Sequence, residues 1–179
     1  MKKLTLLVSL LFAQLTVSQT AVDNDTLEIW TVFSTGNFVR QHAERIVAQK
    51  WPFSIKGVAG DVVSDELMDT VTLHNQRIWK YLDLNGYVDS KNQFEMDMGQ
   101  EVQRIQKAVD IADAHPKVKK LLDKWRKSGR QPYTELKKLS LVSYEFFLYS
   151  FDLNHLEEEQ KLELQYRVNY DTEEIIFTE

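Results

Sequence analysis

Two short turns and two histidines are the parts of this chain whose residue types and spacing could do chemistry. Each turn follows a strand-like run and precedes a helix-like run, so each would lie at a helix N-terminus, where unpaired N–H groups favour anions. Their small and polar side chains would let a ligand reach the backbone. The candidate ligand-binding residues in the turns are Ser34, Thr35, Gly36, Asn37, Gly60 and Asp61.

His42 and His74 fall on or beside the apolar stripes of the two helices that leave those turns. Because the imidazole pKa is easily placed near neutrality, either side chain could act as a general base or a ligand. The alternative is that both are core residues with locally satisfied nitrogens, and that both turns need Gly and capping residues for local reasons only. Both alternatives stay open at the level of the sequence.

No established catalytic pattern accompanies these residues. The chain has no cysteine, no G-x-S-x-G or H-E-x-x-H, and no glycine spacing typical of a dinucleotide or P-loop site. Carboxylate pairs such as Asp61/Asp65 and Asp110/Asp113 occur without a diagnostic arrangement. Catalytic residues therefore stay unassigned. The enzyme hypothesis kept as an alternative is a small metal-independent hydrolase or lyase that uses His and Asp at the strand-to-helix edge.

The stretch from Asp83 to Asp89 is similar to a calcium loop around Gly86. If Gly86 is the sixth loop position, Tyr81 is the first and Asn92 the twelfth, where Asp and Glu are needed as hard oxygen ligands. The sequence therefore predicts a helix-ending turn, with no metal site and no cofactor.

Charge is unevenly distributed along the chain. Residues 116–138 hold nine Lys and Arg against two acids, whereas residues 157–179 hold eight acids against two basic residues. The two segments could face each other or be solvated. The sharper hypothesis is a patch on helix 116–127 that contacts an anion, a membrane surface or a partner, with Trp125 as an interfacial anchor. Its candidate contact residues are Lys117, Lys120, Lys124 and Trp125. A formal net charge of −5 argues against a nucleic-acid partner.

The elements that would position these residues follow from periodicity. Strands are predicted over 26–33 and 53–59, with a helix over 38–50 between them. Because such a β-α-β unit normally makes a right-handed crossover between parallel strands, both turns should emerge side by side at one sheet edge. Three further helices are predicted over 64–85, 92–114 and 116–128.

The C-terminal third is predicted to be mainly strand. Residues 139–153 fit both a period of two and a helical period, and their aromatic content favours a strand. Residues 161–170 and 173–178, joined at Asp171-Thr172, are typical of a hairpin. The predicted fold class is α+β, with an N-terminal β-α-β unit, a helical middle and C-terminal antiparallel strands packing on the same core.

The first eighteen residues have the features of a secretory signal peptide. Lys2 and Lys3 precede an uncharged run over 4–17, and Thr16 and Ser18 are small residues at the −3 and −1 positions. The run is too short for a membrane span and contains Gln14. We therefore expect a signal peptide at 1–18 and a single domain at 19–179, exported to the periplasm or the medium without a transmembrane anchor.

These observations together predict an exported binding or accessory protein of the cell envelope. Its partner would be a small molecule or an envelope protein, and the lack of a catalytic set argues weakly against an enzyme. The hydrolase or lyase described above and a protein that docks through helix 116–127 remain the alternatives.

Overall fold

The computed structural model describes residues 27–32, 37–60, 62–152 and 160–178. Within these residues the elements follow in the order β1 (Glu28–Val32), α1 (Phe38–Ala48), β2 (Ser54–Ala59), α2 (Asp65–Leu84), α3 (Ser90–Ala114), α4 (Pro116–Ser128), β3 (Gln131–Lys138), β4 (Ser143–Phe151), β5 (Lys161–Asn169) and β6 (Glu174–Thr178). This is the predicted α+β class. The predicted signal peptide at 1–18 lies outside the described residues.

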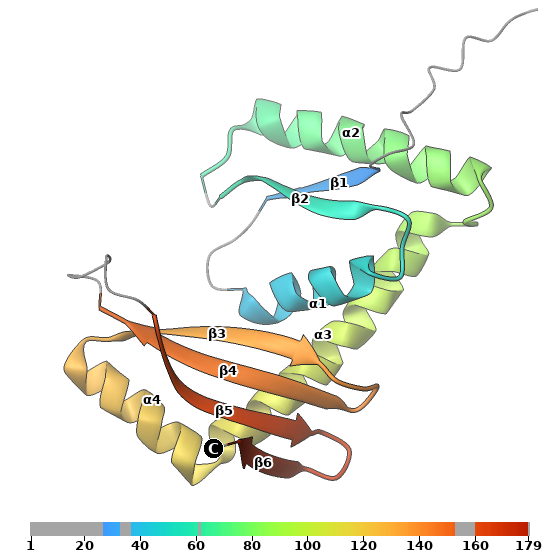
Figure 1. Ribbon diagram of the computed structural model, residues 1–179. Helices are drawn as coiled ribbons and strands as arrows, with labels where there is room; N and C mark the ends of the chain where they lie inside the picture. The colour runs from blue at the N-terminus through green and yellow to red at the C-terminus, as the bar shows by residue number, and fades with distance from the viewer. Residues whose placement is uncertain (1–26, 33–36, 61, 153–159, 179) are drawn as a thin grey trace, which may run out of the picture.

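The N-terminal unit is β-α-β, as predicted. Strands β1 and β2 pair in parallel, from Glu28 opposite Ser54 to Val32 opposite Ala59, and form a two-stranded sheet of their own. Helices α1 and α2 lie on opposite sides of this sheet (Figure 1). The predicted parallel pairing is therefore confirmed, and the described ends of the two strands adjoin.

The helical middle begins and ends near the residues that the sequence indicated. The Ser64 hydroxyl accepts a hydrogen bond from the Leu67 N–H and caps α2, and Gly129 ends α4 with φ of 71°. That φ is left-handed, which Gly adopts without steric cost. None of the helices in the described ranges is both long and apolar enough to cross a membrane.

The C-terminal strands form a four-stranded antiparallel sheet in the order β3-β4-β5-β6. The predicted strand within 139–153 and the predicted hairpin are confirmed as β4, β5 and β6. Strand β3 was not predicted. It starts Gln-Pro-Tyr and ends Lys-Lys, so its sequence has no clear strand signal. Its regular pairing with β4, which runs from Gln131 opposite Phe151 to Lys138 opposite Tyr144, holds it as a strand.

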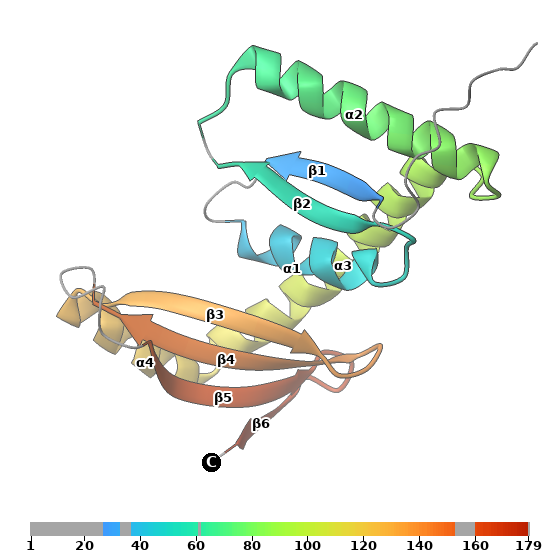
Figure 2. The same cartoon turned by 45° about the horizontal axis from the view of Figure 1, so that its top comes forward.

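The long helix α3 connects the two sheets. It packs against α1 at its N-terminal end and against β4 and β5 further along, and α4 lies beside it on the same sheet (Figures 1 and 2). The buried side chains form one cluster that runs from β1 to β5. Its largest fully buried members in the C-terminal part are Trp125, Tyr144 and Phe146.

Candidate functional site

Of the turn residues predicted to bind a ligand, the structure describes Asn37 and Gly60. The Asn37 side chain caps α1, with its Oδ1 accepting from the Arg40 N–H at 3.2 Å. Gly60 is exposed and its α-carbon faces open space. Ser34, Thr35, Gly36 and Asp61 lie outside the described residues. The β5–β6 hairpin lies far from this strand edge (Figure 1).

The two histidines do not share a site. The His74 ring lies 2.8 Å, through Nε2, from the carbonyl oxygen of Glu28, and it stacks on Trp30 with ring centroids 3.9 Å apart. The His42 ring lies 3.0 Å, through Nδ1, from the carbonyl oxygen of Phe38. Because a carbonyl only accepts, each of these ring nitrogens carries the donated hydrogen. The histidines sit on helices at opposite sides of the two-stranded sheet, so each has its own surroundings.

Residues 83–89 form the helix-ending turn that the sequence predicts. Asp83 Oδ1 accepts from the Ser90 N–H at 2.8 Å, and this hydrogen bond lowers the pKa of Asp83. Asp89 accepts from the Asn92 side chain, and Asn85 donates to the Tyr81 carbonyl. The carboxylates of Asp83 and Asp89 are therefore engaged within the turn. No group of three or more His, Asp or Glu side chains suited to a metal ion occurs in the described part of the chain.

A buried polar network in the C-terminal half was not foreseen from the sequence. Glu101 is 1% exposed, and its carboxylate accepts hydrogen bonds from Lys138 Nζ at 2.7 Å and from the Tyr144 hydroxyl at 2.8 Å. Arg104 adds a contact at 3.3 Å. Burial opposes the charged form of Glu101, but the hydrogen bonds from Lys138, Tyr144 and Arg104 and the charge of Lys138 together outweigh burial, so the pKa of Glu101 lies below its usual value.

The network is a structural connection between α3, β3 and β4. Burial and the charge of Glu101 raise the pKa of the Tyr144 hydroxyl, which keeps Tyr144 a neutral donor. A buried carboxylate is tolerated where several donors surround it. The network therefore accounts for a glutamate on the buried face of α3.

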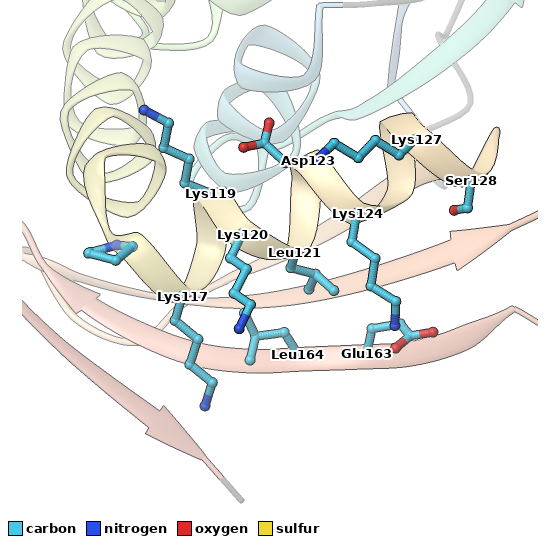
Figure 3. A pocket seen from close by; sticks show the side chains of 11 residues that line it. Lys117, Lys119, Lys120, Leu121, Asp123, Lys124, Lys127, Ser128, Glu163 and Leu164 are labelled. Carbon is cyan, nitrogen blue, oxygen red and sulfur yellow. The ribbon is translucent and has the colours of Figure 1, made fainter.

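A hollow with a volume of about 870 Å³ lies between α4 and β5. We call it the lysine groove. Figure 3 shows Leu121 and Leu164 on its floor, with the side chains of Lys117, Lys120 and Lys124 extending from α4 toward the strands. Lys119 and Lys127 of the same helix also line the groove (Figure 3). The groove therefore has a cationic side above an apolar floor.

The charges around the groove are partly compensated. Lys161 Nζ lies 3.6 Å from Glu163, and Lys117 Nζ lies 4.3 Å from the centre of the Phe177 ring. Within the described ranges, Lys120 and Lys124 make no ion pair closer than 4.0 Å. The groove thus keeps cationic side chains available to an anionic group.

The expected interfacial role of Trp125 is wrong. Trp125 is 1% exposed and belongs to the core cluster. Helix α4 turns Val118 and Trp125 inward, seven residues or about two turns apart, while the lysines of the groove lie on other faces of the helix. Four surface contact residues were expected on this helix. Lys117, Lys120 and Lys124 line the groove, whereas Trp125 packs in the core.

The other side of the groove could not be assigned from the sequence. Lysines at positions i, i+3 and i+7 mark one face of α4, and Leu121 lies beside them, which is a local signal. Glu163 and Leu164 come from β5, and only the packing of α4 on the sheet brings them to the groove. No family model, curated protein or solved structure matches this chain significantly.

Proposed function

We propose that this protein is a docking module that binds an acidic, partly apolar segment of a partner protein in the lysine groove. The observation that supports it best is the row of Lys117, Lys120 and Lys124 above the apolar floor of Leu121 and Leu164. A row of cations attracts carboxylates, and an apolar floor adds affinity that charge alone does not supply.

The spacing of the lysines suits an extended segment. On a helix that rises 1.5 Å per residue, the row from Lys117 to Lys124 spans about 10 Å. In an extended chain, alternate side chains point to the same side and lie about 7 Å apart. A segment with acidic residues at alternate positions would therefore place two carboxylates over the row and turn its intervening apolar side chains to Leu121 and Leu164.

The proposal also accounts for the charge pattern of α4. Exposed ion pairs are individually worth up to about 1 kcal/mol, so no single lysine carries the binding. Several of them on one face steer an acidic partner and set its orientation. Binding should therefore weaken as salt concentration rises.

We further propose that the module works outside the cytoplasm, in the cell envelope or the medium. The basic start, the uncharged run and the small residues before position 19 support export. Mass analysis of the exported protein tests this directly. A mature chain that begins at or near Gln19 is the expected result, and exported material that still begins at Met1 would contradict cleavage.

The docking proposal is tested with a synthetic peptide of alternating Glu and Leu and with its Lys-and-Leu counterpart. Isothermal titration calorimetry should show saturable binding of the acidic peptide and no binding of the Lys-and-Leu peptide. A triple variant Lys117→Gln, Lys120→Gln, Lys124→Gln should weaken binding about tenfold, because three exposed attractions of about 0.5 kcal/mol each are lost.

The matched control is the double variant Arg77→Gln, Lys80→Gln on α2, whose exposed side chains do not line the groove. It removes positive charge from the protein but should leave affinity within about twofold of the parent, since neither side chain lies at the groove. If both variants lost the same binding free energy per charge removed, the attraction would be nonspecific and the groove would be rejected as the binding site. Binding of anionic phosphatidylglycerol vesicles without binding of the peptide would reject a protein partner.

A further inference from the structure

A second hollow lies between the two halves of the molecule, where α1 passes beside β3 (Figure 1). It has a volume of about 380 Å³. We call it the His42 cavity, because His42 lines it together with Arg45, Ile46 and Gln49 of α1 and with residues 135–138 of β3. The four residues of α1 follow one another at i, i+3, i+4 and i+7, so they share one face of the helix. Ligand pockets usually have volumes of about 300–1,000 Å³, so an occupant of this cavity is small.

His42 offers a hydrogen-bond acceptor at the cavity. The residue is only 9% exposed, and its Nδ1 donates to the Phe38 carbonyl at 3.0 Å. In the neutral ring the other nitrogen, Nε2, therefore carries a lone pair. Within the described ranges Nε2 has no hydrogen-bond partner, yet it is not among the unpartnered side-chain atoms that are closed to solvent. The cavity that His42 lines therefore gives a ligand access to this nitrogen.

Two lysines at the cavity already have carboxylate neighbours in the protein. Lys138 Nζ donates to Glu101 at 2.7 Å. Lys137 stands opposite Glu145 in the register of β3 and β4, and its positive charge stabilises that carboxylate. Both lysine charges are therefore compensated, and the other charged residues of the lining are one cation from α1 and one carboxylate from β3.

These two residues, Arg45 and Glu135, line the same cavity without pairing. Within the described ranges neither makes an ion pair closer than 4.0 Å. Glu135 Oε1 accepts a long hydrogen bond from the Tyr133 hydroxyl, at 3.4 Å. Two opposite charges in this arrangement leave a gap that a molecule with both charges can bridge.

The electrostatics place Arg45, Glu135 and His42 around one space. Burial lowers the pKa of His42, and among the nearby charges Arg45 adds to this effect whereas Glu135 opposes it. The same two charges act on Tyr133, which shares a face of β3 with Glu135. Burial raises the pKa of Tyr133, Glu135 adds to the rise, and Arg45 opposes it. Arg45 therefore extends from α1 toward the face of β3 that carries Glu135.

A zwitterion fits this lining better than a single ion does. An anion would pair with Arg45 but would leave the Glu135 carboxylate and the His42 lone pair without a donor. A cation would satisfy those two acceptors but would be repelled by Arg45. A molecule with an ammonium and a carboxylate close together provides a partner for all three groups. Ile46 adds an apolar wall for a short aliphatic side chain.

We propose that the His42 cavity binds a small α-amino acid, whose ammonium group donates to His42 Nε2 and to Glu135 and whose carboxylate accepts from Arg45. The site is independent of the lysine groove, because the two share no lining residue. It adds a small-molecule ligand, held between the β-α-β unit and the C-terminal sheet, to a protein whose proposed partner is another protein.

The test follows the ring resonances of His42 in the full-length protein by NMR, with the assignment made from His42→Gln. The pH is kept above 6.5, where the ring is neutral. The probes are glycine, L-alanine and L-leucine. Each is compared with the acid that lacks its ammonium group and the amine that lacks its carboxylate, which are propionate and ethylamine for L-alanine. At least one amino acid should shift the His42 resonances in a saturable way, and its two comparators should bind at least about tenfold more weakly, because each loses a charged hydrogen-bonding group.

Variants then locate the bound amino acid. Arg45→Gln and Glu135→Gln change exposed side chains, so both should fold with the parent's circular dichroism spectrum. Each should weaken binding of the active probe at least about fivefold. The matched control is Arg77→Gln on α2, an exposed arginine that does not line the cavity, and it should leave affinity within about twofold of the parent.

A further control separates this cavity from the lysine groove. The triple variant of Lys117, Lys120 and Lys124 should bind the amino acid as the parent does, whatever its effect on the acidic peptide. Loss of amino-acid binding in this variant would place the probe in the groove and contradict a separate site.

Three other results would overturn the proposal. One is the absence of a saturable shift with all three amino acids, which would mean that solvent alone fills the cavity. Another is a comparator that binds as tightly as its amino acid, which would make the cavity a site for a single ion. The third is unchanged affinity in a folded Arg45→Gln, which would place the probe elsewhere.

Discussion

The side-chain amide of Asn75 hydrogen-bonds both backbone groups of Trp30. Its Oδ1 accepts from the Trp30 N–H at 2.9 Å, and its Nδ2 donates to the Trp30 carbonyl at 2.8 Å. His74, the preceding residue on α2, hydrogen-bonds the carbonyl of Glu28. Side chains of α2 therefore hydrogen-bond backbone groups of β1 that do not pair with β2. The two-stranded sheet is thus covered at one of its two open edges. This explains why a histidine of α2 faces the sheet.

Replacement of Asn75 by Ala should destabilise the protein by about 1–3 kcal/mol, because two buried backbone groups lose their partners. Asn75→Asp can still accept from the N–H but cannot donate to the carbonyl, so we expect it to be destabilised as well. Urea unfolding measures both. The neighbouring exposed residue provides the control, Gln76→Ala, which should change stability by less than about 0.5 kcal/mol. Equal effects at positions 75 and 76 would contradict the role of the amide.

Replacement of Glu101 by Gln should lower the free energy of unfolding by about 3 kcal/mol, because Lys138 keeps its charge in a largely buried position without a carboxylate. The variant should also lose part of the acid sensitivity of the parent. The folded-state pKa of Glu101 lies below its ordinary value of 4.5. Its contribution is therefore fully present above pH 4.5 and is lost as the pH falls toward the folded-state pKa.

Urea midpoints from pH 7 downward check the Glu101 prediction, with Glu135→Gln on the exposed face of β3 as the control. The parent and the control should lose stability below pH 4.5 more steeply than Glu101→Gln. Parallel pH profiles for all three proteins would mean that the network does not hold the charge on Glu101.

His42 should titrate below its ordinary pKa of 6.5, because burial disfavours the imidazolium form and outweighs the hydrogen bond to Phe38. Between the folded-state pKa and pH 6.5, His42 therefore binds a proton in the unfolded chain but not in the folded protein. Stability should accordingly begin to fall as the pH drops below 6.5, down to the folded-state pKa. An NMR titration of the His42 ring measures the value directly, and His42→Gln should remove this part of the pH profile. A titration midpoint at or above 6.5 would contradict it.

Trp125 should behave as a core residue and not as a membrane contact. Trp125→Ala should cost about 3–5 kcal/mol of stability, because it deletes a fully buried aromatic side chain. Trp125→Phe keeps part of the volume and should remain folded at room temperature. With this variant, co-sedimentation with phosphatidylglycerol vesicles should equal that of the parent. A selective loss of vesicle binding in a stable Trp125→Phe would restore the interfacial role.

The elements that the sequence predicted are those with a local signal. The β-α-β unit, the helix boundaries at Ser64 and Gly129, and the C-terminal hairpin follow from periodicity, caps and turn residues that lie within a few positions of each other. The choice of a strand within 139–153 rested on composition, and it is confirmed by β4. The three lysines of the groove were also found in this way, since their spacing along one helix is itself local.

Tertiary structure alone decided the rest, because the partners are distant in the sequence. Strand β3 is polar at both ends and is held by β4. Glu101 is buried on α3 because Lys138 and Tyr144, 37 and 43 residues later, come to meet its carboxylate. The same holds for His74, whose backbone partner lies 46 residues earlier on the edge of β1. A sequence pattern gives the face that a side chain occupies, but whether that face meets water, a carboxylate or an unpaired carbonyl depends on how the elements pack.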